Sequence, residues 1–135
     1  MRLLIDGNII LDVLQKREPH FADSSGVWKL CEIEQTEGYV STLTFANLVY
    51  VMRKELDPEQ IEDVLKKLSI IFRFTELNIS DLKRAAAMKW DDYEDALQAA
   101  AAERLHMDYI ITRNVTDFKN SRIMAITPTE LLTRI

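Results

Sequence analysis

The 135-residue sequence has few of the residues that mark extracellular, membrane-embedded or multidomain proteins. Its one cysteine, Cys31, cannot form an internal disulfide, which favours a reducing setting. Three glycines and three prolines leave little room for linkers. No apolar run reaches the roughly 20 residues of a transmembrane helix, and the N-terminus lacks a signal-peptide pattern. We therefore expect a cytoplasmic protein without membrane contacts, folded as a single domain over residues 1–135.

Positive charge is also scarce in this sequence. The net charge is −5 and the isoelectric point is about 5.1. This balance argues against a generally basic nucleic-acid-binding surface, but it allows a local basic patch or a bound cation that supplies positive charge. Hydrophobic residues make up 47% of the chain, which is enough for a globular core.

Apolar periodicity predicts short strands that alternate with longer helices. Continuous apolar runs predict buried strands over 3–5 and 109–111, and further strands are expected over 39–40 and 123–126. Helices are expected to begin near residues 9, 22, 44, 58, 81, 92 and 128. This alternation favours an α/β fold, a three-layer α/β/α sandwich around a mainly parallel sheet of four to five strands.

Local signals suggest where several elements begin and end. Asn8 is expected to cap the helix at 9–16, Gly38 to end the helix at 22–36, and Ser80 to cap the helix at 81–88. Asp57 before Pro58 is a strong helix-start signal. The segment 70–77 shows partial alternation, which is compatible with a fifth strand or with an extended connection.

Acidic and amide side chains follow the two most apolar predicted strands. Asp6 comes directly after the first strand, and Asn114 and Asp117 follow the strand at 109–111. Because ligand sites of open α/β sheets form at the carboxyl ends of the strands, these side chains are expected to lie close together. Asp6 alone has a simpler explanation, since aspartate often caps a following helix.

Two further carboxylates stand near the start of an alanine-rich helix. Asp92 and Asp95 are three residues apart, so on a helix they share a face. The presence of an acidic residue at Asp92 is accounted for by the helix dipole, which favours negative charge in a first turn, and this explanation is preferred to metal ligation. Asp95 precedes the apolar Ala96 and Leu97 and is the better candidate for a ligand.

Carboxylates that converge in this way repel one another at neutral pH. The repulsion is relieved by protonation or by a bound cation. Oxygen ligands without histidine or cysteine partners select a hard ion, Mg²⁺ or Mn²⁺. Such an ion lowers the pKa of a bound water and polarises phosphoryl oxygens, so the pattern indicates phosphodiester chemistry.

Three segments together resemble the PIN-domain nucleases: Leu4–Asn8, Asp92–Gln98 and Thr112–Phe118. They occur in the family's order and span nearly the whole chain, and the length is similar to that of bacterial toxins from type II toxin–antitoxin systems. The resemblance implies a metal-dependent ribonuclease that hydrolyses single-stranded RNA. It also implies a possible antitoxin partner and a homodimer.

Carried over by position, the resemblance implies a metal and catalytic site of Asp6, Asp95 and Asp117, with Mg²⁺ or Mn²⁺ as cofactor. The supporting positions are Asn8, Asn47, Asp92, Thr112 and Asn114. Arg113 stands beside the site in sequence, where it either steadies a substrate phosphate or is a solvated charge at a strand end.

Asn47 departs from the family pattern. The family often has glutamate at this place in the helix after the second strand, and a carboxamide brings an oxygen ligand without a charge. The site would then hold its metal less tightly. The alternative is therefore a catalytically weak or inactive PIN-like nucleic-acid-binding module.

Other readings of strand-end aspartates fit less well. An aspartyl-nucleophile phosphatase has a second aspartate two residues after the first, where this chain has Asn8. A receiver domain has a lysine at a late strand end, and the segment 123–126 has none. A partner-binding protein is also possible. Apolar residues of the third helix, Phe45, Val49 and Met52, form either a dimer face or a core face.

Overall fold

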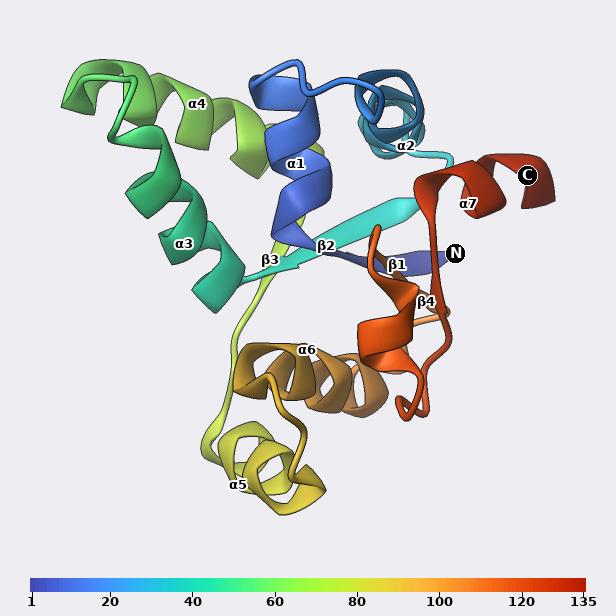
Figure 1. The fold of residues 1–135 in the computed structure, drawn as a ribbon. Coiled ribbons are helices and arrows are strands. Elements are labelled where there is room, and N and C mark those ends of the chain that lie inside the picture. The colour runs from blue at the N-terminus through green and yellow to red at the C-terminus, as the bar shows by residue number, and fades with distance from the viewer.

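The computed structural model describes residues 1–135, which form a five-stranded sheet between two layers of helices (Figure 1). The strands are β1 (Arg2–Ile5), β2 (Glu37–Ser41), β3 (Arg73–Thr75), β4 (Tyr109–Ile111) and β5 (Ala125–Ile126). Their order is β3-β2-β1-β4-β5, and every neighbouring pair is parallel. The predicted α/β/α sandwich is confirmed, and the segment near Phe72 contributes the fifth strand.

Seven α-helices and one 3₁₀ helix surround this sheet. One face carries α1 (Gly7–Leu14), α2 (Phe21–Glu32), α4 (Pro58–Ile71) and α7 (Pro128–Arg134), while α5 (Ile79–Met88) and α6 (Tyr93–Arg104) cover the other (Figure 1). The helix α3 (Thr42–Met52) packs against α1, and η1 (Val115–Phe118) follows β4. None of these helices has the length and apolar composition needed to cross a bilayer.

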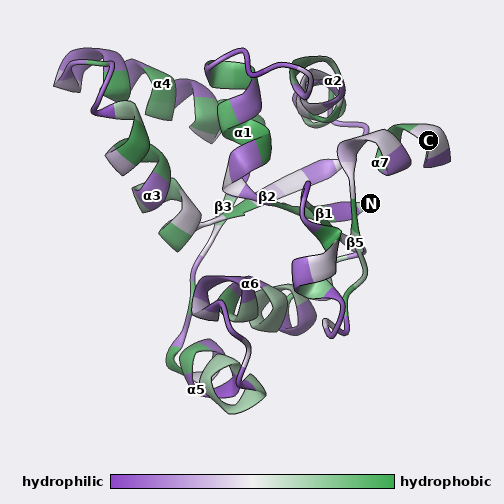
Figure 2. Ribbon diagram, viewed as in Figure 1, coloured by the Kyte–Doolittle hydropathy of each residue, from purple (hydrophilic) through white to green (hydrophobic).

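The central strand β1 divides the core into two parts. Leu3 and Ile5 belong to the larger cluster beneath α1 and α2, whereas Leu4 belongs to the cluster beneath α6. All three side chains are fully buried, and β1 is correspondingly hydrophobic in Figure 2. A strand covered on both faces needs this continuous apolar sequence because successive side chains point to opposite sides.

The alanines of α6 explain how this helix fits between the sheet and α5. Ala99 and Ala102 pack against Leu4 in the second cluster, and Ala96 and Ala100 pack with Ala85 of α5 in a third. Small side chains on both sides allow α6 to approach its neighbours closely. The start of α6 is thereby fixed beside the carboxyl end of β1.

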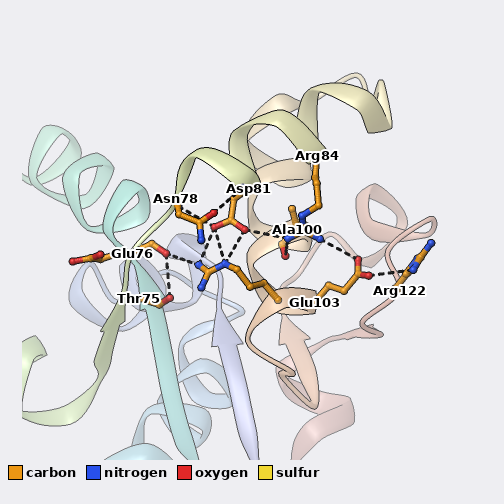
Figure 3. A network of polar contacts seen from close by, with 9 residues as sticks. Thr75, Glu76, Asn78, Asp81, Arg84, Ala100, Glu103 and Arg122 are labelled. Atoms are coloured by element: carbon orange, nitrogen blue, oxygen red, sulfur yellow. Dashed lines mark hydrogen bonds and ion pairs between the residues drawn. The ribbon is translucent and has the colours of Figure 1, made fainter.

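A buried polar network adds a second connection between α5 and α6 (Figure 3). The Asp81 side chain, which is 0% exposed, accepts hydrogen bonds from Arg104 Nε at 2.9 Å and Nη2 at 2.8 Å and from Arg84 Nη2 at 3.1 Å. Arg104 also donates to the carbonyl of Glu76, and Arg84 to that of Ala100. This network joins α5, the loop before it and α6.

Three of the predicted boundaries were wrong. The helix α1 begins at Gly7 with Asp6 in the N-cap position, so Asn8 lies inside the helix. Asn78 rather than Ser80 caps α5, because Asp81 three residues later completes a capping box with it. The helix α2 ends at Glu32, and Gly38 lies within β2 instead of ending the helix.

Tertiary packing decides two questions that the local pattern leaves open. Most of the strand expected over 70–77 does not form: α4 continues to Ile71, and β3 has only three residues. Met52 is 3% exposed and belongs to the large core cluster, so it does not contribute to an exposed dimer face.

Gly38 is required by close packing rather than by backbone conformation. A Cβ atom at this position would lie 2.6 Å from Cys31 Sγ and 2.9 Å from a ring carbon of Phe72. Gly38→Ala should therefore lower the free energy of unfolding by about 1–3 kcal/mol, measured by urea denaturation. The double variant with Cys31→Ala should recover part of this loss; an unchanged stability of the single variant would contradict the packing.

Candidate functional site

The predicted acidic residues lie at the carboxyl ends of the strands, where the chain changes direction across the sheet. From β1 it proceeds to β2 and β3 on one side, and it later returns to place β4 and β5 on the other. Ile5 pairs with Ile111 in the register of β1 and β4, so Asp6 and Thr112 leave the sheet side by side. This is the switch point at which open α/β sheets form their ligand sites.

Asp6 occupies the N-cap position of α1, but its side chain does not cap the helix. Its Oδ2 atom instead accepts a hydrogen bond of 2.9 Å from the hydroxyl of Thr112. The fully buried Thr112 oxygen also accepts from the backbone N–H of Asn114 at 3.1 Å. Burial raises the pKa of Asp6, and the Thr112 hydrogen bond partly offsets this rise. Asp6 is thus held toward the crevice rather than toward the helix.

A pocket of about 290 Å³ opens over Asp6. The predicted site residues that line it are Asp6, Asn8, Asn47, Asp92, Asp95, Asn114 and Asp117. They come from the segments that follow β1 and β4, including the first turn of α1 and η1, and from α3 and the start of α6, while Thr112 donates its hydroxyl to Asp6. The structure therefore brings together all three predicted acidic ligands, and no lysine or arginine lines this pocket.

Asp95 is the most perturbed carboxyl group of the pocket. Burial, followed by the negative charges of neighbouring acidic residues, raises its pKa to about 7. In decreasing order these neighbours are Asp92, Asp6, Asp117 and Glu94. Asp92 itself caps α6, since its Oδ1 accepts from the backbone N–H of Asp95 at 3.1 Å. A carboxyl group that is half protonated near neutral pH is suited to accept or donate a proton.

This raised pKa makes the metal-free fold sensitive to pH. Folded Asp95 binds its proton more tightly than the unfolded chain, so its contribution is fully present below about pH 4 and is lost as the pH rises through about 7. Asp95→Asn should make the metal-free protein more stable than wild type at about pH 8, by about 1 kcal/mol because solvent screens the charge, and not at about pH 4. Thermal denaturation at both pH values checks this, and the same difference at both would contradict it.

The sequence did not point to three polar residues that line the pocket, Thr44, Glu94 and Gln98. Glu94 Oε2 accepts a hydrogen bond of 3.3 Å from Asn47 Nδ2, so it reaches across from α6 to α3. Gln98 lies one turn after Asp95, and its buried Oε1 has no hydrogen-bond partner. Gln98 had a signal, because it is the one polar residue in the buried stretch Ala96–Ala102 and shares a face with Asp95.

Arg113 contacts a different part of the molecule. Its Nε atom lies 3.1 Å from Oδ2 of Asp12, whose side chain is 0% exposed and also accepts from the hydroxyl of Ser24. Arg113 lines a hollow between His20 and Thr129 and does not line the acidic pocket. Its guanidinium therefore pairs with a buried carboxylate of α1, and its contact with substrate stays a prediction.

The donor atoms of the pocket suit a hard divalent cation. Five carboxylates, the amide oxygens of three asparagines and the unpartnered Gln98 Oε1 supply oxygen ligands only. The carboxylates share one pocket, although no three acidic, histidine or cysteine side chains are gathered as closely as the ligands of one ion. Mutual repulsion keeps like charges apart, and a cation would relieve it.

Comparison with known proteins identifies the fold family. The family model described as the PIN domain matches residues 2–116. The chain belongs to the PIN-domain family. Among curated proteins, none matches this sequence. The matched region contains Asp6 and Asp95 and ends one residue before Asp117.

Solved structures show the same PIN fold over nearly the whole chain. A toxin–antitoxin complex from Klebsiella pneumoniae contains a chain with a TM-score of 0.72 and 21% identity, which covers 93% of this chain and 97% of that one. FitAcB from Neisseria gonorrhoeae gives 0.71 and 20%, with 94% and 98% covered. VapC20 from Mycobacterium tuberculosis gives 0.63 and 10%, with 80% and 86% covered.

Proposed function

We propose that this PIN domain, spanning residues 1–135, is a metal-dependent endoribonuclease that hydrolyses single-stranded RNA in the cytoplasm. The observation that carries the proposal is the meeting of Asp6, Asp95 and Asp117 in one pocket at the switch point of the sheet. The pKa of Asp95, raised to about 7 in the metal-free protein, reflects repulsion among these carboxylates that a bound cation would relieve. VapC20, which has a similar fold, is described as a toxin that cleaves the sarcin–ricin loop.

Asp6, Asp95 and Asp117 would hold Mg²⁺ or Mn²⁺ through their carboxylate oxygens. When bound, such an ion supplies an activated water and stabilises charge on the phosphoryl oxygens. Thr112 fixes the orientation of Asp6 through its hydroxyl, and it also fixes the start of the segment that carries Asn114. Asp95 accepts the proton of the attacking water on a carboxylate oxygen.

We also propose that the protein acts as the toxin of a toxin–antitoxin pair and forms a homodimer. Several structures with this fold are described as toxin–antitoxin complexes, including those from Klebsiella pneumoniae and nontypeable Haemophilus influenzae. An antitoxin that covers the acidic pocket would keep RNA from entering. Growth arrest upon expression of the wild-type chain but not of Asp6→Asn tests the toxin role.

The test of the enzyme is cleavage of a labelled single-stranded RNA with Mg²⁺, with Mn²⁺ and with a chelator. Cleavage should require the ion, and it should continue when the 2′-hydroxyls are methylated, because water rather than the 2′-hydroxyl attacks the phosphorus. No 2′,3′-cyclic phosphate should form. Cleavage in the chelator, or products with cyclic phosphates, would contradict the proposal.

The second candidate is a nucleic-acid-binding module without turnover. Asn47 favours it, because this residue adds an amide rather than a charge to the pocket and donates its N–H to Glu94. RNA binding without cleavage at any concentration of Mg²⁺ or Mn²⁺ would support this candidate over the nuclease.

A further inference from the structure

A second hollow, of about 670 Å³, adjoins the acidic pocket. The two share Asp92, Asp95 and Asp117, so they form one continuous depression across the start of α6. The outer wall of the second hollow comes from the segment between α5 and α6 and from the end of η1. We call this second hollow the exit groove.

The exit groove, unlike the acidic pocket, is lined by basic residues. Lys89 and Lys119 are the only basic residues that line either hollow, one on each of the two wall segments. Both are exposed, and neither forms an ion pair or a side-chain hydrogen bond. Most arginines of the chain, in contrast, are engaged with acidic or aromatic partners. The two lysines are therefore free to bind an anion.

Beyond the lysines, the exit groove continues into a third hollow. Met88, Trp90 and Asn120 line both, while the far side is lined by Arg84 and Arg122 together with Glu103, which forms ion pairs with both arginines. Trp90 is held in place by edge-to-face packing against Phe118, with ring centroids 6.1 Å apart. Free cations beside an aromatic side chain in one groove are typical of single-stranded nucleic-acid paths, and Lys89, Lys119 and Trp90 line the exit groove together.

We propose that Lys89 and Lys119 bind the RNA phosphates next to the scissile one, and that the strand leaves the acidic pocket past Trp90. This inference rests on the proposed function and adds the direction of the substrate. The carboxylates that the groove shares with the pocket repel phosphates, so the strand should bind well only when a divalent ion neutralises them. The lysines then supply positive charge that the lining of the acidic pocket lacks.

The test compares two double variants with the same change of charge. Lys89→Gln/Lys119→Gln removes the groove cations, and Lys66→Gln/Lys67→Gln removes two exposed lysines of α4, on the opposite face of the sheet (Figure 1). The probe is a fluorescein-labelled oligouridine with phosphorothioate linkages, which resists cleavage. Anisotropy titrations with Mn²⁺ at several salt concentrations give the affinity and its salt dependence.

The groove variant should bind the probe at least about 10-fold more weakly than wild type. The slope of log affinity against log salt should become shallower by about 0.7 per lost phosphate contact, or about 1.4 for both lysines. The α4 variant should match wild type, and Mn²⁺ affinity should be unchanged in both. Equal losses in the two variants, or no loss in the groove variant, would overturn the proposal.

A second readout concerns the position of the strand. The chain has two tryptophans, so Trp28→Phe leaves Trp90 as the single one. Trp28 packs on Phe72 in the larger core cluster, away from the exit groove. The oligouridine should then quench the fluorescence of Trp90, and the groove variant should need at least about 10-fold more probe for the same quenching. Binding without quenching would overturn the path. Failure of RNA cleavage alone would contradict the proposed function and leave these binding outcomes to decide the path.

Discussion

Replacing Asp95 with asparagine should lower the rate of metal-dependent RNA cleavage by about 100- to 10,000-fold, the range for loss of a positioned general base. Asparagine keeps the shape of the side chain but can neither accept a proton nor bring a charge to the ion. The environment of Asp95 supports a large effect, because burial and the carboxylates around it raise its pKa to about 7 in the metal-free protein, and the ion would offset this repulsion only where Asp95 keeps its charge. The measurement is the single-turnover cleavage rate at saturating Mn²⁺.

The matched control for this variant is Asp63→Asn. Asp63 lies exposed on α4 and forms no ion pair, so the same chemical change there should leave cleavage within about 2-fold of wild type. The Asp95 variant should also keep its helical circular dichroism, because its backbone N–H still donates to Asp92. Full activity in a folded Asp95→Asn protein would remove Asp95 from the mechanism.

The largest expected effect on stability comes from Asp81. Asp81→Ala should lower the free energy of unfolding by about 3 kcal/mol, because it leaves Arg104 and Arg84 without their buried partner. It also removes half of the capping box with Asn78 at the start of α5. Urea denaturation followed by circular dichroism measures the loss. A change below about 1 kcal/mol would show that the network of Figure 3 contributes little.

The contribution of Asp81 should disappear in acid. Burial by itself raises the pKa of Asp81. The hydrogen bond from Arg104, the N–H of Asn78 and the charge of Arg104 together lower this pKa by more, so the net shift is downward. A group with a lowered folded pKa stabilises the fold above its unfolded pKa of about 4, and this stability is lost as the pH falls through the folded value. The difference in stability between wild type and Asp81→Asn should therefore shrink as the pH falls below about 4.

Local signals predicted those parts of the fold in which neighbouring residues decide the structure. The apolar runs of β1 and β4 and the helix start at Asp57–Pro58 are confirmed, the latter with a capping box that includes Gln60. The predicted role of Gly38 as a helix end is wrong, because glycine is required there by contacts with Cys31 and Phe72, and Phe72 is distant in sequence. Such contacts depend on tertiary packing, which a local pattern does not contain.

The candidate site, too, could be predicted only where neighbouring residues decide its geometry. Strand-end logic was enough to predict the meeting of Asp6 with the segment after β4, and the register of β1 and β4 realises it. Asn47 and Glu94 are 47 residues apart in the sequence. Their hydrogen bond forms because α3 and α6 meet at the pocket, which no local pattern predicts. No sequence pattern singles out the lysines of the exit groove, because they belong to short connecting segments without periodicity.

The most direct test of the acidic pocket as a metal site is isothermal titration of Mn²⁺ into the wild-type protein and into Asp6→Asn. We expect binding to the wild type and loss of that binding in the variant. Asparagine retains an oxygen that can accept the Thr112 hydrogen bond, so the variant should stay folded. Equal Mn²⁺ affinity in the two proteins, or no binding to the wild type, would contradict the account.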